Sequence, residues 1–221
     1  MNILVAAPHP DDELIGCGGS LIGHIRRQEQ IYIVYMTSGN AGCSDISKHD
    51  LGLLRENEAK KAASLLGIKD LIFLRNDDGY LQYDKNNLIK IVRLIREIKP
   101  NLVYIPHQGE AHQDHRMTHE LLTEAIRRAK GPWFQECGGE PWAVEAVLCY
   151  EVWSPLQKIS YVEDITNVVD LKMEAIRSHV SQIKEIAYDE AAKALNRYRG
   201  ISTGRGPYCE CFEVLSTSKI Y

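Results

Sequence analysis

Residues 2–13 read NILVAAPHPDDE, an apolar run that ends at Pro8 and passes directly into charged residues. An apolar stretch without alternating polar positions is typical of a strand buried on both faces. A second such run covers residues 31–36, and apolar residues recur at helical spacing over 18–28. We therefore expect a strand–helix–strand unit, with a polar, glycine-rich loop between Pro8 and the helix.

The same alternation continues through the middle of the chain. Parallel strands need helical crossovers that cover both faces of the sheet, so repeated strand–helix pairs indicate a parallel arrangement. The sequence therefore predicts an α/β fold, Rossmann-like and doubly wound, with a mainly parallel sheet and helices on both faces. The expected helices cover 51–66, 86–98 and 118–129, and the expected strands cover 71–74 and 102–105.

Beyond Gly131 the pattern loosens through several glycines and prolines. We expect no domain boundary there, because no repeat, low-complexity tract or linker interrupts the chain, and we predict a single domain over residues 1–221. The predicted elements of this last part are strands over 146–153, 159–162 and 208–215 and one long helix over 170–198.

Composition excludes several classes of partner. Of the 221 residues, 44% are hydrophobic, which is enough for a full core without a stabilising metal or disulfide. The 26 Lys and Arg residues against 30 Asp and Glu give a net charge of -4, without a basic block. Nucleic acid and anionic membranes are therefore not expected as partners. No apolar run approaches the roughly 18 residues that a membrane-spanning helix needs.

The cysteine pattern indicates the compartment. Six cysteines lack both the paired spacing of zinc ribbons and the density of disulfide scaffolds. The start of the sequence lacks the charged and small-residue regions of a signal peptide. We therefore expect reduced thiols and a cytoplasmic location.

Two clusters of histidines and carboxylates follow predicted strands, over residues 8–13 and 110–115. In doubly wound sheets ligands bind beyond the carboxyl ends of the strands, where the strand order reverses. If the order is 3-2-1-4, the first and fourth strands are neighbours and the two clusters converge. Imidazoles with carboxylates suit zinc, and a catalytic zinc site uses three protein ligands and one open position. A zincin motif is excluded, because Arg116 stands where the glutamate between His115 and His119 is required.

These residues resemble the LmbE-like or PIG-L-type zinc-dependent de-N-acetylases. The segment 7–13 is similar to the first family motif and residues 112–115, HQDH, to the second, and the resemblance covers nearly the whole chain. The family removes acetyl groups from N-acetylglucosamine-containing molecules, and the late segments of this chain lean toward its bacterial glucosaminyl-malate type. Weaker marks of the family are Thr37-Ser38-Gly39, Arg55 with Glu58, Asp78-Gly79, Ser181-Gln182 and Arg199-Gly200.

The resemblance implies a role for each residue of the first motif. His9 and Asp12, with His115 of the second motif, would hold one zinc ion per chain. Asp11 would be the general base, because an adjacent carboxylate that does not bind the metal can take a proton from the attacking water. Fe2+, Co2+ or Mn2+ are also compatible with this ligand set.

Five further roles follow from the resemblance. His112 would face the developing oxyanion, and Asp114 would orient an imidazole from behind. Arg55 and Asp78 match positions that grip sugar hydroxyls, although Arg55 also has Glu58 as a helical neighbour and Asp78 stands in a turn sequence. His179 is a candidate for substrate contact. Trp133, Trp142 and Trp153 are expected to pack in the core or in loops, and a sugar platform formed by Trp133 and Trp142 is the alternative. His24, His49 and His107 are expected on the surface.

The resemblance predicts a hydrolase that releases acetate from a small amino-sugar compound, active as a homo-oligomer, either a trimer or a hexamer. Two alternatives stay open. A metal-dependent phosphoesterase would need a second metal and further bridging carboxylates. A sugar-binding protein without activity would not need the base at Asp11.

Overall fold

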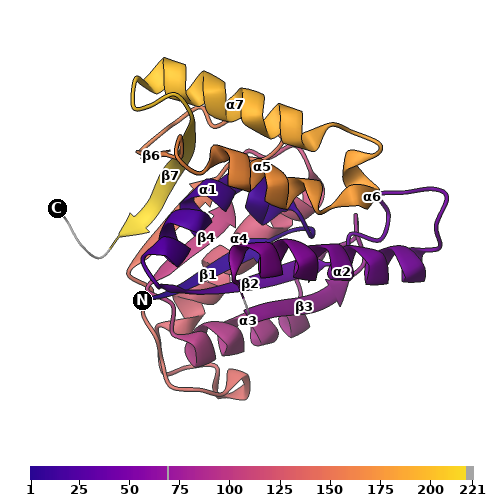
Figure 1. Ribbon diagram of the computed structural model, residues 1–221. Coiled ribbons are helices and arrows are strands. Elements are labelled where there is room, and N and C mark those ends of the chain that lie inside the picture. The colour runs from indigo at the N-terminus through magenta and orange to yellow at the C-terminus, as the bar shows by residue number, and fades with distance from the viewer. Residues whose placement is uncertain (69, 218–221) are drawn as a thin grey trace.

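One sheet organises the chain in the computed structural model, which describes residues 1–68 and 70–217 (Figure 1). The strands are β1 (Asn2–Ala7), β2 (Gln30–Thr37), β3 (Asp70–Asn76), β4 (Leu102–Pro106), β5 (Ala146–Tyr150), β6 (Tyr161–Asp164) and β7 (Cys209–Thr217). Their order in the seven-stranded sheet is β3-β2-β1-β4-β5-β7-β6. All neighbouring pairs from β3 to β5 are parallel, and β7 is antiparallel to both β5 and β6. The predicted α/β class and mainly parallel sheet are confirmed.

Helices cover both faces of this sheet, as the alternation predicts. They are α1 (Asp12–Arg26), α2 (Lys48–Leu66), α3 (Lys85–Ile98), α4 (Gln113–Ala129), α5 (Val169–Arg177), α6 (Val180–Ile183) and α7 (Tyr188–Thr203), with a short 3-10 turn η1 (Gln135–Cys137). No helix in the described ranges is long and apolar enough to cross a membrane.

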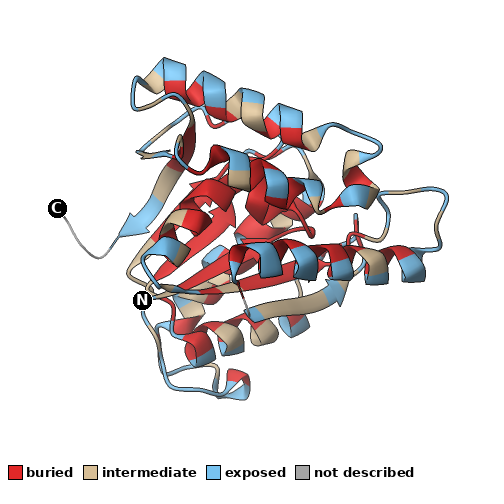
Figure 2. Cartoon of the chain, in the orientation of Figure 1, coloured by how far each residue is buried: buried red, intermediate tan, exposed pale blue. Residues whose placement is uncertain are grey.

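Strand β1 lies in the middle of the sheet and separates two hydrophobic cores. Ile3 and Val5 point to the core under α1, α2 and α5, whereas Leu4 and Ala6 point to the core under α3 and α4. Buried residues follow the sheet and the inner helix faces (Figure 2). The continuous apolar run of the sequence is therefore explained by burial of alternate side chains on opposite faces.

Helix α1 starts at Asp12, six residues before the predicted start, so the prediction of a loop through the glycines was wrong. These glycines serve close packing. A Cβ at Gly16 would overlap the Tyr150 ring, and one at Gly19 would lie 2.6 Å from Ile165. Glycine is required here because neighbouring side chains reach the helix backbone, although it weakens the helix itself.

Two other helical predictions also need correction. Helix α4 starts at Gln113 instead of 118, and the predicted long helix over 170–198 is three helices. The break after α5 is fixed by a contact with α2: Glu58 accepts hydrogen bonds from the backbone N–H and the hydroxyl of Ser181, at 2.8 and 2.7 Å. The Glu58 side chain of α2 therefore binds polar groups at the start of α6. Helical periodicity in the sequence does not reveal this long-range contact.

The strand order places the two sequence clusters at one edge. Strand β1 pairs with β2 on one side and with β4 on the other, so the order reverses between β1 and β4. The chain leaves both strands at their carboxyl ends, through residues 8–11 after β1 and 107–112 after β4. The predicted convergence of these segments is confirmed.

Candidate active site

A cavity of about 550 Å³ lies at this edge of the sheet. It collects side chains from both motifs and from the later part of the chain. Its lining residues are His9, Asp11, Asp12, Gly42, Arg55, Asp78, Ala111, His112, Trp153, Gln182, Ile186 and Tyr188.

The loop after β1 presents Asp11 in a rare backbone conformation, with φ 131° and ψ -28°. The Asp11 carbonyl oxygen accepts the N–H groups of Leu14 and Ile15 and so begins α1. Arg55 of α2 donates to the Pro10 carbonyl oxygen at 2.7 Å, and its guanidinium lies 3.0 Å from the Asp11 carboxylate. A positive φ at a non-glycine residue costs free energy and persists only where the surroundings enforce it. Arg55 is one such constraint.

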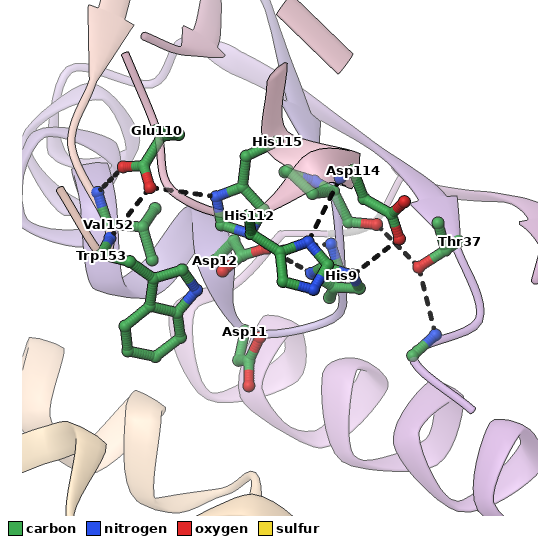
Figure 3. A network of polar contacts seen from close by, with 12 residues as sticks. His9, Asp11, Asp12, Thr37, Glu110, His112, Asp114, His115, Val152 and Trp153 are labelled. Carbon is green, nitrogen blue, oxygen red and sulfur yellow. Dashed lines mark hydrogen bonds and ion pairs between the residues drawn. The ribbon is translucent and has the colours of Figure 1, made fainter. Parts of the chain in front are cut away.

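His9 stands between carboxylates on both sides of its ring. Its Nδ1 lies 3.1 Å from Asp12 Oδ2, and its Nε2 lies 3.2 Å from Asp114 Oδ2 (Figure 3). The same Nε2 lies 3.0 Å from Asp78 Oδ1. Asp114 is itself fixed, because its carboxylate accepts the backbone N–H groups of Gly79 and Leu81. The Asp114 carboxylate is therefore held in place beside the His9 imidazole, which is the contact that its predicted role requires.

His115, on the first turn of α4, has the same arrangement. Its Nε2 lies 3.2 Å from Asp12 Oδ2, and its Nδ1 faces Glu110 Oε2 at 3.6 Å. The residue is fully buried, and neither ring nitrogen makes a hydrogen bond of good geometry within the described part of the chain. Asp12 thus contacts both predicted imidazole ligands, and a further carboxylate backs each imidazole.

This pattern fits a metal centre. Metal-binding histidines usually direct the second ring nitrogen to a carboxylate or a carbonyl group, which fixes the ring and its tautomer. Ligand atoms of His9, His112 and His115 also lie within 4.8 Å of one another, as do those of His9, Asp78 and Asp114. Both groups of possible ligands include His9, so they describe two overlapping positions for a metal ion.

The charges in the cluster shift the pKa values in opposite directions. Burial alone would lower the pKa of His115, but the Asp12 charge outweighs it and raises the pKa to about 9. Burial likewise acts against the raised pKa of His9, which results from Asp114, Asp12 and Asp78. The pKa of Asp12 is lowered, because His115 and His9 outweigh the effect of burial. Asp12 is therefore an ionised carboxylate between two imidazoles.

Asp11 has the opposite shift. Burial raises the pKa of its carboxyl group to about 7, even though the Arg55 charge acts in the other direction. Its side chain lines the cavity and hydrogen-bonds to neither predicted imidazole ligand. A carboxylate with a pKa close to neutrality matches the requirement for a general base that must later return its proton.

The other candidate residues occupy different depths. Asp78 and His112 line the cavity, and the His112 ring centroid lies 4.9 Å from that of His9. Arg55 also lines it and does not pair with its helical neighbour Glu58, the alternative to a sugar contact. Arg55 contacts Asp11 and two backbone carbonyl groups, and Glu58 binds Ser181. His179 is fully buried behind the cavity, and its ring nitrogens make no hydrogen bond with any described residue.

Sequence reasoning missed the role of Glu110. Its carboxylate accepts the backbone N–H groups of Val152, Trp153 and Ser154 at 2.6, 3.2 and 3.3 Å while facing His115 (Figure 3). Burial would raise its pKa, but these bonds and the neighbouring His107 and His115 lower it to about 2. The available signal was a carboxylate two positions before the second motif, in the loop that follows β4.

For Glu13, directly after the predicted ligand Asp12, the sequence leaves a helix cap and a supporting contact behind the ligands both open. Its buried carboxylate accepts the Tyr35 hydroxyl at 2.7 Å and the Asp11 backbone N–H at 3.3 Å. Glu13 thus supports the strained loop that presents Asp11. The expectation that His24 and His107 lie on the surface was wrong, since both are buried. His24 is hydrogen-bonded to the Tyr104 hydroxyl, and His107 is hydrogen-bonded to the Ser154 carbonyl oxygen.

The tryptophans were only partly anticipated. Trp142 packs against the core and donates to the Pro100 carbonyl oxygen, as expected of a packing residue. Trp153 instead has 41% of its surface exposed and lines the cavity. No local pattern signals this position, which depends on the path of the chain after β5.

The chain is similar in sequence to deacetylases of N-acetylglucosamine-containing compounds. A family model described as GlcNAc-PI de-N-acetylase, PIG-L, matches residues 4–126. Diacetylchitobiose deacetylase of Thermococcus kodakarensis is 33% identical over 197 residues, which cover 85% of this chain and 72% of the relative. A probable N-acetyl-alpha-D-glucosaminyl L-malate deacetylase 2 of Bacillus anthracis is 29% identical over 194 residues, covering 82% and 81%.

Solved structures share the architecture. N,N'-diacetylchitobiose deacetylase from Pyrococcus horikoshii has a TM-score of 0.88 and 29% identity, covering 97% of this chain and 83% of its own. The 4-carboxy-2-hydroxymuconate hydratase GalB has a TM-score of 0.86 at 22% identity, so the fold alone does not define a reaction. The family model extends over more than half of the chain and both of its histidine motifs, and the chain belongs to the PIG-L family of de-N-acetylases.

Proposed function

We propose that this chain is a metal-dependent deacetylase that hydrolyses the N-acetyl group of an N-acetylglucosamine-containing small molecule. The products are acetate and a free amine. The observation that carries the proposal is the position of Asp11: a buried carboxylate with a pKa of about 7, lining the same cavity as His9 and Asp12. The names of similar proteins, which are deacetylases of diacetylchitobiose and of GlcNAc-malate, supply the substrate class.

His9, Asp12 and His115 are the proposed metal ligands. Their fit rests on Asp12, which contacts an inward ring nitrogen of each histidine, and on Asp114 and Glu110, which face the outward ring nitrogens. Zinc suits this donor set, and Fe2+, Co2+ or Mn2+ suit it as well. When bound, such an ion supplies Lewis-acid chemistry, acidifying a water molecule and polarising the amide carbonyl group.

Asp11 is the proposed general base. Its ionised carboxylate takes a proton from the attacking water, and the resulting acid returns the proton to the leaving amine. A pKa near neutrality suits both steps, because neither protonation state is then strongly favoured. Arg55 holds this carboxylate at 3.0 Å and fixes its direction.

His112 is the proposed partner of the developing oxyanion. Burial and the charges of His9 and His115 lower its pKa, so the ring is neutral near pH 7. Its Nδ1 accepts the backbone N–H of Asp114 at 3.2 Å, which places the ring proton on Nε2. His112 therefore presents a hydrogen-bond donor to the cavity, as stabilisation of an oxyanion requires.

The roles of Arg55, Asp78 and His179 toward the sugar remain proposals. Asp78 lines the cavity with a carboxylate that also contacts His9 and the backbone N–H of Ala41. Arg55 is better placed to hold Asp11 than to bind a hydroxyl group. His179 is enclosed, so its contact with substrate would require movement of α6.

Acetate release from a panel of N-acetylglucosaminides tests the proposal. The metal-loaded wild type is compared with the chelated enzyme and with Asp11→Ala, with the bound metal measured in each. We expect release by the metal-loaded wild type alone. Absence of release from every compound, with stoichiometric metal bound, would remove the proposed activity.

The same samples address the phosphoesterase alternative. The second group of possible ligands, His9, Asp78 and Asp114, shares His9 with the first, and Asp114 is occupied by two backbone N–H groups. We therefore propose one metal per chain. Two equivalents of metal, with hydrolysis of a phosphate ester, would support the alternative.

A homo-oligomer and a cytoplasmic location are also proposed. All six cysteines are free thiols, which supports a reducing compartment. Light scattering of the purified protein tests for a trimer or hexamer, and fractionation of the source cells tests the location.

A further inference from the structure

The outer part of the cavity has an apolar side, here called the aromatic wall and formed by Trp153, Ile186 and Tyr188. The Trp153 and Tyr188 rings contact each other, with centroids 4.9 Å apart and planes at 54°. Trp153 is 41% exposed and Ile186 is 54% exposed. Exposed apolar side chains at the entrance of a polar site are typical of a ligand-binding surface.

The aromatic wall is fixed relative to the reacting groups. Glu110 accepts the N–H groups of residues 152–154 and also faces His115. The Trp153 backbone is therefore held by the same carboxylate that supports a proposed metal ligand. Asp11 and the aromatic wall line the same cavity, so one small molecule can contact both.

The entrance offers no available cation to an anionic group. Arg55 is the only Lys or Arg among the described residues that line the cavity, and it is 4% exposed. Its guanidinium already contacts the Asp11 carboxylate and the carbonyl oxygens of Pro10 and Gly39. A carboxylate on the substrate would therefore find no guanidinium or ammonium partner in this cavity.

A neighbouring cavity of about 290 Å³ adds negative charge at the same entrance. It shares Gly42 with the active-site cavity and is lined by Asp45 and Glu185. Lys61 and Lys184 line a third cavity, which shares Asp45 and Glu185 with this neighbouring cavity but no residue with the active-site cavity. The nearest lysines therefore lie beside carboxylates outside the active-site cavity, and none of them lines the cavity where it could pair with an anionic aglycone.

We propose that the aromatic wall is a subsite for a neutral ring attached to the N-acetylglucosamine, such as a second sugar. The ring would lie with its apolar C–H face against Trp153, while its hydroxyl groups face water. This inference rests on the proposed deacetylase activity and specifies its substrate: an uncharged glycoside, in preference to a conjugate that carries carboxylates such as malate.

The experiment compares kcat/KM for acetate release from diacetylchitobiose, GlcNAc-malate and free N-acetylglucosamine. The enzymes are the metal-loaded wild type, Trp153→Ala, Trp153→Phe and Trp133→Ala. Trp133 is the matched control, because it is 70% exposed and lies outside the cavity. Trp153→Phe tests whether an aromatic ring is sufficient.

The wild type should prefer diacetylchitobiose to GlcNAc-malate by at least about tenfold, a factor typical of one aromatic contact together with one unpaired charge. Trp153→Ala should lose about tenfold in kcat/KM on diacetylchitobiose, mainly through KM, and less than about twofold on N-acetylglucosamine. Trp153→Phe should retain most of the activity, and Trp133→Ala should behave as the wild type.

Faster deacetylation of GlcNAc-malate than of diacetylchitobiose would overturn the inference while leaving the deacetylase activity established. An equal loss on all three compounds in Trp153→Ala would also overturn it, because the tryptophan would then act through the structure of the site. No acetate from any compound would reject the deacetylase activity, and the subsite with it.

Discussion

Two buried charged clusters in this molecule differ in how well their polar atoms are satisfied. The structural cluster consists of Lys172, Asn196 and Glu210 under α1, and the site cluster consists of His9, Asp12, Glu110, Asp114 and His115. In the structural cluster Lys172 Nζ donates to the Ile15 carbonyl oxygen, Asn196 Oδ1 and Glu210 Oε1 at 2.8, 2.9 and 2.8 Å. Glu210 also accepts bonds from Gly19 and Ser20.

The site cluster is left incomplete by comparison. Its imidazoles and carboxylates are close together, yet both ring nitrogens of His115 lack a hydrogen bond of good geometry among the described residues. Several of its pKa values depart from their ordinary range, as functional sites often require. A completed network such as the first stabilises the fold, whereas an incomplete one leaves ligand atoms available for a metal and a substrate. Substitutions in each cluster distinguish a role in stability from a role in metal binding and catalysis.

The largest effect is expected at Asp11. Asp11→Ala should lower kcat by about 10²–10⁴-fold, the range typical of a lost general base, while metal content stays at one per chain. His9→Ala or His115→Ala should lose both activity and metal. Steady-state kinetics with elemental analysis of the same samples decides the matter, and full activity in Asp11→Ala would remove its assignment as base.

Breaking the structural cluster should affect folding instead of chemistry. Lys172→Met leaves Glu210 buried without its cation and should lower the free energy of unfolding by about 3–5 kcal/mol. Urea denaturation measures this loss, and kcat/KM at 25 °C should stay within about twofold of the wild type. The double variant Lys172→Met/Glu210→Gln should lose less than the sum of the single changes. A loss in the double variant equal to the sum of the two single losses would show that Lys172 and Glu210 are not energetically coupled.

Metal removal should destabilise the protein through the site cluster alone. Ligand binding to the folded state stabilises it, by about 2.7 kcal/mol when the free metal is 100 times its dissociation constant. Chelation should therefore lower the Tm of the wild type and leave that of His9→Ala unchanged. His24→Ala is the control, because it removes a buried histidine outside the site cluster and should keep the metal-dependent shift.

The smallest effect is expected at His179, which is buried next to the site and should change only how stability depends on pH. Burial, with a further contribution from the Arg55 charge, lowers its pKa from 6.5 to about 3. Above pH 6.5 the ring is neutral in both the folded and the unfolded chain, so its titration does not change the free energy of unfolding. As the pH falls, the unfolded chain binds a proton that the folded chain cannot, so stability decreases.

The loss should approach about 1.4 kcal/mol per pH unit below pH 6. Denaturation of the wild type and His179→Leu between pH 5 and 8 measures this difference. The variant should show the shallower dependence on pH. Parallel curves for the two proteins would contradict burial of a neutral imidazole.

The sequence predicted the strand order around β1 and the meeting of the two motifs, because apolar runs and strand–helix alternation carry that information. The starts of α1 and α4 were placed too late for a shared reason. In both helices the first turn carries the polar residues of a motif, such as Asp12 and Asp114, and polar residues before an apolar pattern resemble a loop. Contacts with the rest of the molecule decide these starts.

Parts of the site were not predictable from local patterns. The motifs pointed to His9, Asp12 and His115, but the function of Glu110 depends on its contact with residues 152–154. Trp153 reaches the cavity only because β5 ends beside β4. These are long-range relations, which a single sequence does not encode as a repeating signal.

The antiparallel strand β7 also determines the order in which the protein can assemble during synthesis. The proposed ligands lie within the first 115 residues, in the loop after β1 and in the first turns of α1 and α4, so they are available once the parallel half of the sheet exists. Strand β6 pairs with β7 alone among the described strands, and β7 spans residues 209–217. Residues 209–217 must therefore leave the ribosome before β6 gains a neighbour, and the aromatic wall, carried partly by α7, is completed after the parallel strands have formed.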